Sequence, residues 1–160
     1  MSEDKTEHSQ KKVDIYRDTP IRYLGYSNEV GEAFRSIIGA KLVWSTYGLA
    51  TAYVLADTFS KTKEMYNETK HHKMQLKKTI YVASDTLIWQ MFASVIIPGF
   101  TINRTCALVN LILEKNKVFP SSIRKWVVTS IGLATIPFII RPIDNLVDDV
   151  LDVTLRKLSP

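Results

Sequence analysis

The separation of charged from apolar residues along the chain constrains its fold most strongly. Three runs, residues 36–56, 79–97 and 126–140, contain only two charged side chains, Lys41 and Asp85. The chain as a whole has 23% charged residues, so the remaining charges are concentrated between and beside these runs. Helical runs of this length and apolarity are typical of membrane spans. The pattern predicts an all-α, polytopic membrane protein with about three membrane-spanning helices and short interfacial helices.

Residues 36–56 are the strongest of the predicted spans. As a helix, this run is long enough to cross a hydrocarbon core of about 30 Å. Gly48, Ala52 and Ala56 recur at every fourth position within it. That spacing places small side chains in one strip along which a second helix could approach closely, although small residues are common in any membrane helix.

The second and third predicted spans each have a weakness. Residues 79–97 carry Asp85 in their first third, where an acid costs roughly 3 kcal/mol on insertion and should face other helices or water. Residues 126–140 would make only roughly 22 Å of helix, so flanking basic side chains must extend to the headgroups. Pro137 is expected to kink this span, which membrane helices tolerate.

Asp85 has a candidate partner in this arrangement. The second and third spans would be antiparallel, so Asp85, near the start of one, and Arg141, at the end of the other, would lie on the same side of the membrane. We expect an interaction between them, direct or through water, because it lowers the cost of burying a carboxylate. The alternatives are that Asp85 extends to the near interface or is protonated.

The string I-P-G-F-T-I-N-R, residues 97–104, follows the second run directly. Pro98-Gly99 is predicted to end the second span, and Asn103 and Arg104 would then begin a new helix at the membrane interface. This helix, about residues 101–113, is too short in its apolar part to cross a bilayer and is interpreted as interfacial or re-entrant. A tilted fourth span that starts near Phe100 is the alternative.

The two ends of the chain differ in pattern. Residues 1–13 are polar and are predicted to be a disordered N-terminus, while residues 14–160 form a single helical membrane domain. After the third span, residues 142–158 have apolar side chains on one side and acids four residues apart on another, which predicts a C-terminal amphipathic helix. The N-terminus lacks the features of a secretory signal peptide or a cleaved mitochondrial presequence.

The placement of basic residues favours a lipid bilayer as the main partner and argues against nucleic acid. The formal charge is +5, but the arginines and lysines flank the apolar runs, as membrane-interface anchors do. The chain shows no pattern typical of a catalytic site, a cofactor site or a metal site, and it contains a single cysteine, Cys106. We therefore expect a protein that is not an enzyme and needs no cofactor.

Several strings together resemble the mitochondrial fission process protein family. These strings are Y-R-D-T (16–19), R-Y-L-G-Y-S-N-E-V-G-E-A-F-R-S (22–36), Y-V-L-A-D (53–57), I-P-G-F-T-I-N-R (97–104), R-K-W (124–126) and R-P-I-D (141–144). The resemblance covers nearly the whole chain, from Asp14 to Pro160. It implies a multi-pass protein of the inner mitochondrial membrane that promotes fission, maintains network shape and works with other proteins of that membrane.

Two other classes of protein remain open at this point. A transporter or channel subunit of the inner membrane would need a polar pathway through its spans, and Asp85 is the only acid in such a position. A soluble helical binding module is the third interpretation.

Overall fold

The computed structural model describes residues 16, 19–70, 73–117 and 119–159, so the predicted N-terminal segment 1–13 lies outside the described residues. In the described part of the chain all regular structure is helical, as predicted. The elements in order are η1 (Pro20–Tyr26), α2 (Ser27–Ile38), α3 (Ala40–Glu68), α4 (Gln75–Gln90), η2 (Met91–Ile96), α5 (Ile97–Lys115), α6 (Ser121–Val153) and η3 (Leu155–Leu158).

The first predicted span is divided between two helices, which corrects the boundaries 36–56. Gly39 has a φ of 81°, a left-handed conformation that glycine adopts without a steric penalty, and it ends α2. The chain reverses there, and α2 packs back against the beginning of α3. α3 then continues past Ala56 to Glu68, well into the charged segment.

The second predicted span does not end at Pro98-Gly99, so the prediction of a separate helix over 101–113 was wrong. α4, η2 and α5 form one continuous helix, Gln75–Lys115, of about 60 Å. η2 is a π-helix, in which the Ile97 N–H bonds to the Phe92 carbonyl five residues back. A proline cannot donate to the carbonyl four residues before it. The wider turn of η2 accommodates this missing bond, so the helix passes through Pro98.

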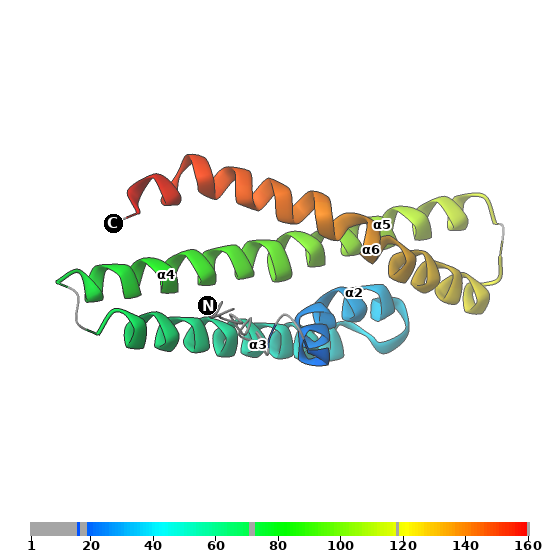
Figure 1. Cartoon of the computed structure of the whole chain (residues 1–160). Coiled ribbons are helices and arrows are strands. Elements are labelled where there is room, and N and C mark those ends of the chain that lie inside the picture. Colours follow the sequence, from blue (N-terminus) through cyan, green and yellow to red (C-terminus); the bar gives the residue numbers. More distant parts are fainter. Residues whose placement is uncertain (1–15, 17–18, 71–72, 118, 160) are drawn as a thin grey trace, which may run out of the picture.

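The third predicted span and the predicted C-terminal helix also form a single helix, which corrects the boundaries 126–140 and 142–158. α6 begins at Ser121 and continues through Pro137 and Pro142 to Val153, where η3 follows. Figure 1 shows the consequence: α3 and α4 form one antiparallel pair, α5 and α6 form a second, and the C-terminal half of α6 returns alongside α4. α2 packs against α3, α5 and α6 where the two pairs meet.

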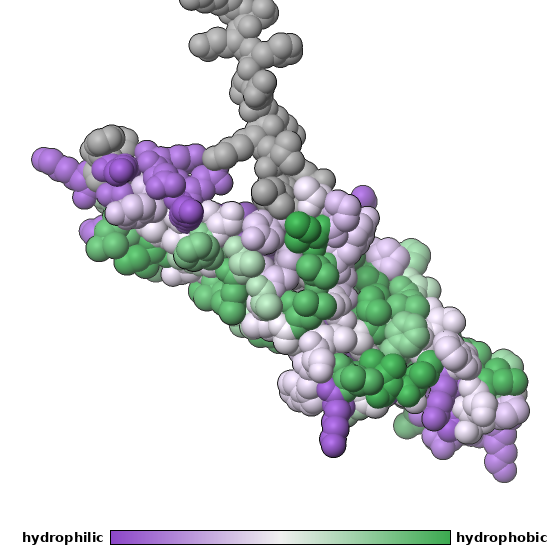
Figure 2. All heavy atoms as spheres, turned by 90° about the horizontal axis from the view of Figure 1, so that it is seen from below, coloured by the Kyte–Doolittle hydropathy of each residue, from purple (hydrophilic) through white to green (hydrophobic). Residues whose placement is uncertain are grey.

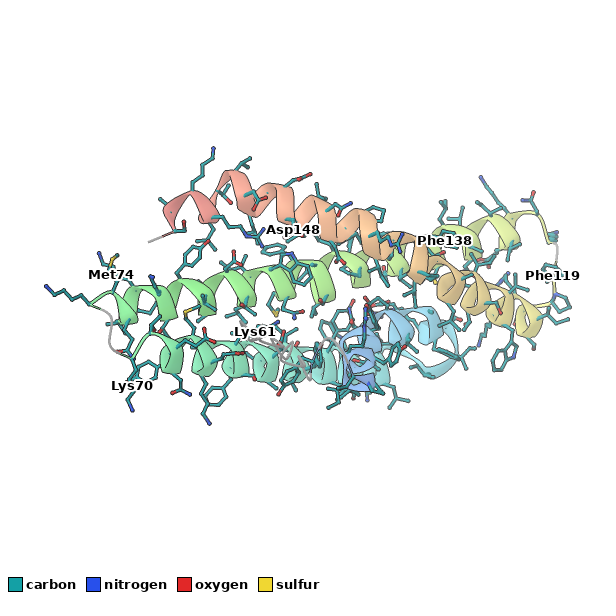
Figure 3. All side chains as sticks on the ribbon, in the orientation of Figure 1. Lys61, Lys70, Met74, Phe119, Phe138 and Asp148 are labelled. Carbon is teal, nitrogen blue, oxygen red and sulfur yellow. The ribbon has the colours of Figure 1, made fainter. Side chains whose placement is uncertain are left out.

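Much of the apolar surface of these helices faces outward. Large side chains such as Trp44 (71%), Trp126 (61%) and Phe138 (78%) are exposed, and Figure 3 shows Phe138 on α6. On the face in Figure 2, hydrophobic residues lie between hydrophilic ends. Among the described residues the buried core is small and forms three clusters, around Ile102 and Val128, around Ala50 and Val54, and around Ile143 and Val147.

Two helices in the described residues are long and apolar enough to cross a membrane, Gln75–Lys115 and Ser121–Leu158. Only 17% and 22% of their most apolar windows are buried inside the chain. A core helix of a soluble protein would be mostly buried, so this exposure is compatible with contact to lipid. The predicted number of about three spans is not confirmed.

Candidate functional site

The Pro98-Gly99 step is the place where α2 and α3 contact the long helix. Asn28 of α2 is completely buried, and its Nδ2 donates a 2.9 Å hydrogen bond to the carbonyl of Val95 inside the π-helix. Gly99 has no room for a side chain, because a Cβ there would overlap the hydroxyl of Tyr47 on α3. The string I-P-G-F therefore lies at a close helix crossing, where the Asn28 side chain donates a hydrogen bond to the Val95 carbonyl of the π-helix.

A buried carboxylate, that of Glu32, joins the same three helices. Arg35 on α2 donates two hydrogen bonds of 2.6 Å to it, Tyr47 donates one of 3.0 Å, and Asn103 on α5 donates one of 2.9 Å. Burial acts to raise the pKa of Glu32, but the hydrogen bonds from Arg35, Asn103 and Tyr47 outweigh it and lower the pKa. Glu32 is therefore ionised, and both of its carboxylate oxygens accept hydrogen bonds. Glu32, Arg35, Tyr47 and Asn103 together form a structural joint between α2, α3 and α5.

The other predicted site residues near this joint point outward. Arg104 is exposed and lies over the Phe100 ring, 5.1 Å from its centroid. Gly48, Ala52 and Ala56 all lie on the exposed side of α3. A Cβ on Gly48 would have nothing within 4 Å, so no described helix packs on that part of the strip. Of the site residues predicted around these positions, only Asn103 is part of the joint.

Asp85 has a basic partner, but the prediction that this partner is Arg141 was wrong. Arg156 Nε bonds to Asp85 Oδ1 at 3.0 Å, whereas Arg141 is exposed. Arg156 also bonds to Asp148 at 2.9 Å and to Asp152 at 2.8 Å. Since α6 is continuous through both prolines, η3, which follows its far end and carries Arg156, lies beside Asp85.

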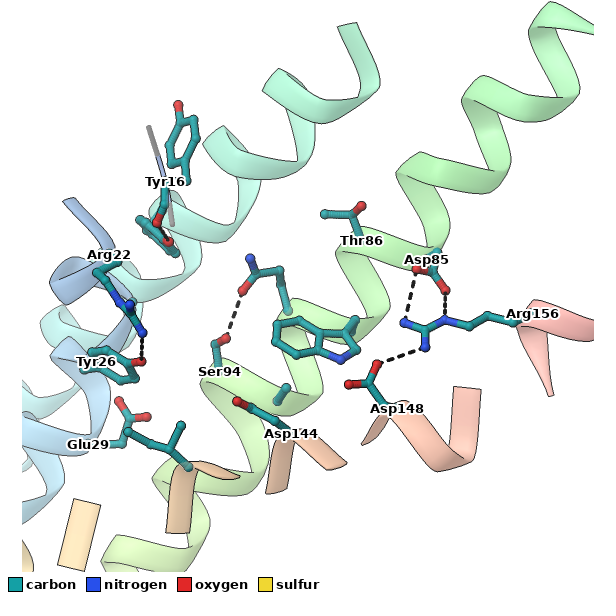
Figure 4. Close-up of a pocket in the computed structure, with 16 residues that line it drawn as sticks. Tyr16, Arg22, Tyr26, Glu29, Asp85, Thr86, Ser94, Asp144, Asp148 and Arg156 are labelled. Atoms are coloured by element: carbon teal, nitrogen blue, oxygen red, sulfur yellow. Dashed lines mark hydrogen bonds and ion pairs between the residues drawn. The ribbon is translucent and has the colours of Figure 1, made fainter. Parts of the chain in front are cut away.

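A polar cavity of about 570 Å³ lies next to the Asp85–Arg156 pair (Figure 4), and residues of η1, α2, α3, α4, η2, α6 and η3 line it. Four carboxylates and two guanidinium groups line it: Glu29, Asp85, Asp144, Asp148, Arg22 and Arg156. Of these, the sequence predicted only Asp85 as a site residue, while Asp144 and Asp148 were expected on the solvated acidic face of the C-terminal amphipathic helix. The best candidate for a ligand-binding site in the described part of the chain is therefore formed by residues from both ends of the sequence.

Glu29 is the most important side chain of this cavity that the sequence did not predict as a site residue. It is 1% exposed, and neither of its carboxylate oxygens has a hydrogen-bond partner among the described residues. Burial raises its pKa to about 8, and the nearby Asp144 contributes in the same direction. The sequence contained a signal for it: Glu32 lies four residues after Asn28 and three after Glu29, so at least two of these polar side chains share a helix face.

Comparison with known proteins identifies the family. The family described as Mitochondrial 18 KDa protein matches residues 14–151. The chain is 51% identical over 148 residues to mitochondrial fission process protein 1 of Caenorhabditis elegans, covering 92% of this chain and 89% of the relative. It is 50% identical over 147 residues to the protein of that name from Homo sapiens, with the same coverage of both chains.

The two most specific strings behind the expected resemblance lie against each other in the structure. N-E-V-G-E-A-F-R lies on α2, I-P-G-F-T-I-N-R lies at the start of α5 directly after η2, and Asn28–Val95 and Glu32–Asn103 bonds connect the two regions. No solved structure matches the chain. The matched residues and the identities nevertheless agree with the resemblance seen in the sequence, and the chain belongs to the Mitochondrial 18 KDa protein family.

Proposed function

We propose that this chain is a non-catalytic, multi-pass protein of the inner mitochondrial membrane that promotes mitochondrial fission and maintains the shape of the network. The observation that carries the fission role is about 50% identity, over nine tenths of the chain, to relatives named mitochondrial fission process protein 1. The outward-facing apolar helices support the membrane assignment.

α3 is proposed as a third membrane helix beside the two longer ones. Its outer surface carries exposed Leu42, Trp44, Leu49 and Leu55, side chains that are stabilised by contact with lipid. Its charged C-terminal part and the α3–α4 turn, marked by Lys70 and Met74 in Figure 3, would extend into water. The long helix exceeds a hydrocarbon core of about 30 Å, so part of it also lies outside the core or is tilted.

Loss and rescue of the protein in cells test the fission role. Depletion should give elongated, hyperconnected mitochondria, excess should give fragments, and the wild-type chain should restore the normal network. Leu49→Asp should fail to rescue because a charge on the lipid-facing side of α3 opposes insertion, whereas Leu49→Ala is the matched control that should rescue. Normal networks in cells that lack the protein and any paralogue would contradict the proposal.

Membrane integration and location are tested separately from morphology. The protein should remain in the membrane pellet after alkaline carbonate extraction, and tags on its termini should show which segments proteases reach in intact mitoplasts. Recovery in the carbonate supernatant would favour a soluble helical module instead. Protection in intact mitochondria that is lost in mitoplasts would support the inner-membrane location.

A transporter subunit is the second candidate, and the polar cavity is the observation that favours it. The cavity brings four carboxylates together, whereas the sequence suggested only one acid, Asp85, as part of a polar pathway. Solute flux in proteoliposomes that Asp85→Asn abolishes would support transport. Absence of such flux from proteoliposomes that contain correctly folded protein would leave the fission role as the better account.

A further inference from the structure

The charges that the described residues place around the cavity do not balance. Four carboxylates face two guanidinium groups, and Arg156 is already bonded to Asp85, Asp148 and Asp152. Arg22 donates a hydrogen bond of 3.3 Å to the hydroxyl of Tyr26. With all acids ionised, the described residues of the cavity wall therefore carry an excess of negative charge, which would attract a cation rather than a phosphate or a carboxylate.

Glu29 is the acid of the cavity wall whose hydrogen-bonding capacity is unused by the described residues. Its side chain extends from α2 toward the cavity, as Figure 4 shows, and both of its oxygens are buried without a hydrogen bond from a described residue. A buried polar group without a partner is costly, and one found in a native fold calls for an explanation. A bound cation would stabilise the ionised carboxylate electrostatically and so account for its burial.

Aromatic rings form a second part of the wall. Tyr16, Tyr26, Tyr53 and Trp89 line the cavity together with the acids. Tyr16 and Tyr53 are packed edge to face, 5.8 Å between ring centroids, and the Tyr53 hydroxyl donates to the Tyr16 carbonyl at 2.7 Å, so these rings are held in place. Rings next to carboxylates are the usual surroundings of an organic ammonium ion, because the ring faces attract cations.

The arrangement fits an organic cation better than a metal ion. Among the described residues no group of three or more histidine, cysteine, aspartate or glutamate side chains is placed to hold a metal. A volume of about 570 Å³ also lies within the range of small-molecule sites. We propose that this cavity binds an organic ammonium group, with Glu29 as its anionic partner and the aromatic rings around it.

Two sources could supply such a group, a phospholipid headgroup or a free amine in solution. The chemistry that recognises them is the same, so choline serves as a probe for both. This proposal does not rest on the fission role, because it concerns binding by the purified protein. If the ammonium site is refuted, the proposed fission role is unaffected, and the reverse is also true.

Trp89 provides a reporter inside the cavity. The chain has three tryptophans, and the other two, Trp44 and Trp126, are on the exposed surface. In the full-length chain with Trp44→Phe and Trp126→Phe, placed in nanodiscs of phosphatidylglycerol, choline should change the Trp89 fluorescence saturably. The uncharged analogue of choline, with carbon in place of the ammonium nitrogen, should produce no saturable change.

Substitutions in the wall test the assignment of residues. Glu29→Gln keeps the shape of the side chain and should weaken choline binding by about tenfold or more, since it removes the charge-assisted contact. Asp144→Asn, at a second acid of the wall, should weaken it less. Asp149→Asn is the matched control, because this exposed acid of α6 does not line the cavity. Circular dichroism and size-exclusion chromatography verify that each variant is folded.

A second series of nanodiscs separates the two sources. If phospholipid headgroups reach the cavity, adding phosphatidylcholine to the nanodisc should reduce the apparent affinity for free choline; if the natural ligand is a soluble amine, the affinity should not change. Either result is compatible with an ammonium site. The proposal is overturned if choline and its uncharged analogue act alike, or if folded Glu29→Gln binds choline as tightly as the wild-type protein does.

Discussion

Gly132→Ala should destabilise the chain, although alanine normally favours a helix over glycine. Gly132 is buried on α6, and a Cβ there would lie 2.6 Å from Cys106 Sγ on α5, 3.0 Å from Ala33 Cβ and 3.3 Å from Ala33 Cα on α2. The thiol can rotate away, but the α2 backbone can yield only if the helix shifts. The substitution therefore tests whether α2, α5 and α6 meet as closely as the structure shows.

The expected magnitude follows from two opposing terms. Replacing a mid-helix glycine by alanine gains up to about 1 kcal/mol, whereas inserting a methyl group into a packed interface costs about 1–3 kcal/mol. Gly48→Ala is the matched control, because Gly48 is also within a helix but a Cβ added to it would meet nothing within 4 Å. The propensity term is common to both, so Gly132→Ala should be less stable than Gly48→Ala by about 1–3 kcal/mol.

Denaturant unfolding of the purified variants in one detergent, followed by circular dichroism, measures this difference. Cys106→Ala in the Gly132→Ala background should recover part of the loss, since it removes the nearest atom. Equal stability of Gly132→Ala and Gly48→Ala, or a Gly132→Ala variant more stable than the wild type, would refute the three-helix contact.

Three other substitutions test the polar interior. Asn28→Ala should lower the free energy of unfolding by about 1–3 kcal/mol, because it leaves a buried carbonyl of the π-helix without a donor; wild-type stability would show that this bond does not matter. Arg156→Gln should lower the free energy of unfolding by about 1–2 kcal/mol, since it leaves three neighbouring carboxylates unpaired. Arg141→Gln should have no measurable effect. If Arg141→Gln were the more destabilising of the two, Arg141 would be the partner of Asp85, as the sequence predicted. Because the pKa of Glu29 is raised from 4.5 to about 8 in the folded chain, its stabilising contribution is fully present below pH 4.5 and lost as the pH rises through 8. Glu29→Gln should thus match the wild type near pH 4.5 and be more stable at pH 9, by at most about 5 kcal/mol in ligand-free protein; parallel pH profiles would contradict this.

The helical class and the apolar surface could be predicted from the sequence because they depend on local pattern. Apart from Gly39, the three apolar runs lie in helices, and many of their large side chains face outward. Family membership was likewise visible in the strings around Asn28 and Asn103, and comparison confirmed it. The position of Asp85 inside an apolar run also predicted correctly that it has a basic partner, but the partner is Arg156 and not the predicted Arg141.

Helix boundaries and the cavity were decided by tertiary structure. When they are considered alone, Pro98 and Pro142 suggest helix boundaries and Pro137 suggests a kink. At Pro98 the π-helix and the Asn28 side chain satisfy the disturbed backbone, so the helix continues. That continuity, together with the unbroken course of α6, carries Arg156 to Asp85 across 71 positions of sequence. The cavity and its buried Glu29 carboxylate exist only because helices distant in sequence come together, and no local pattern specifies which side chains will meet.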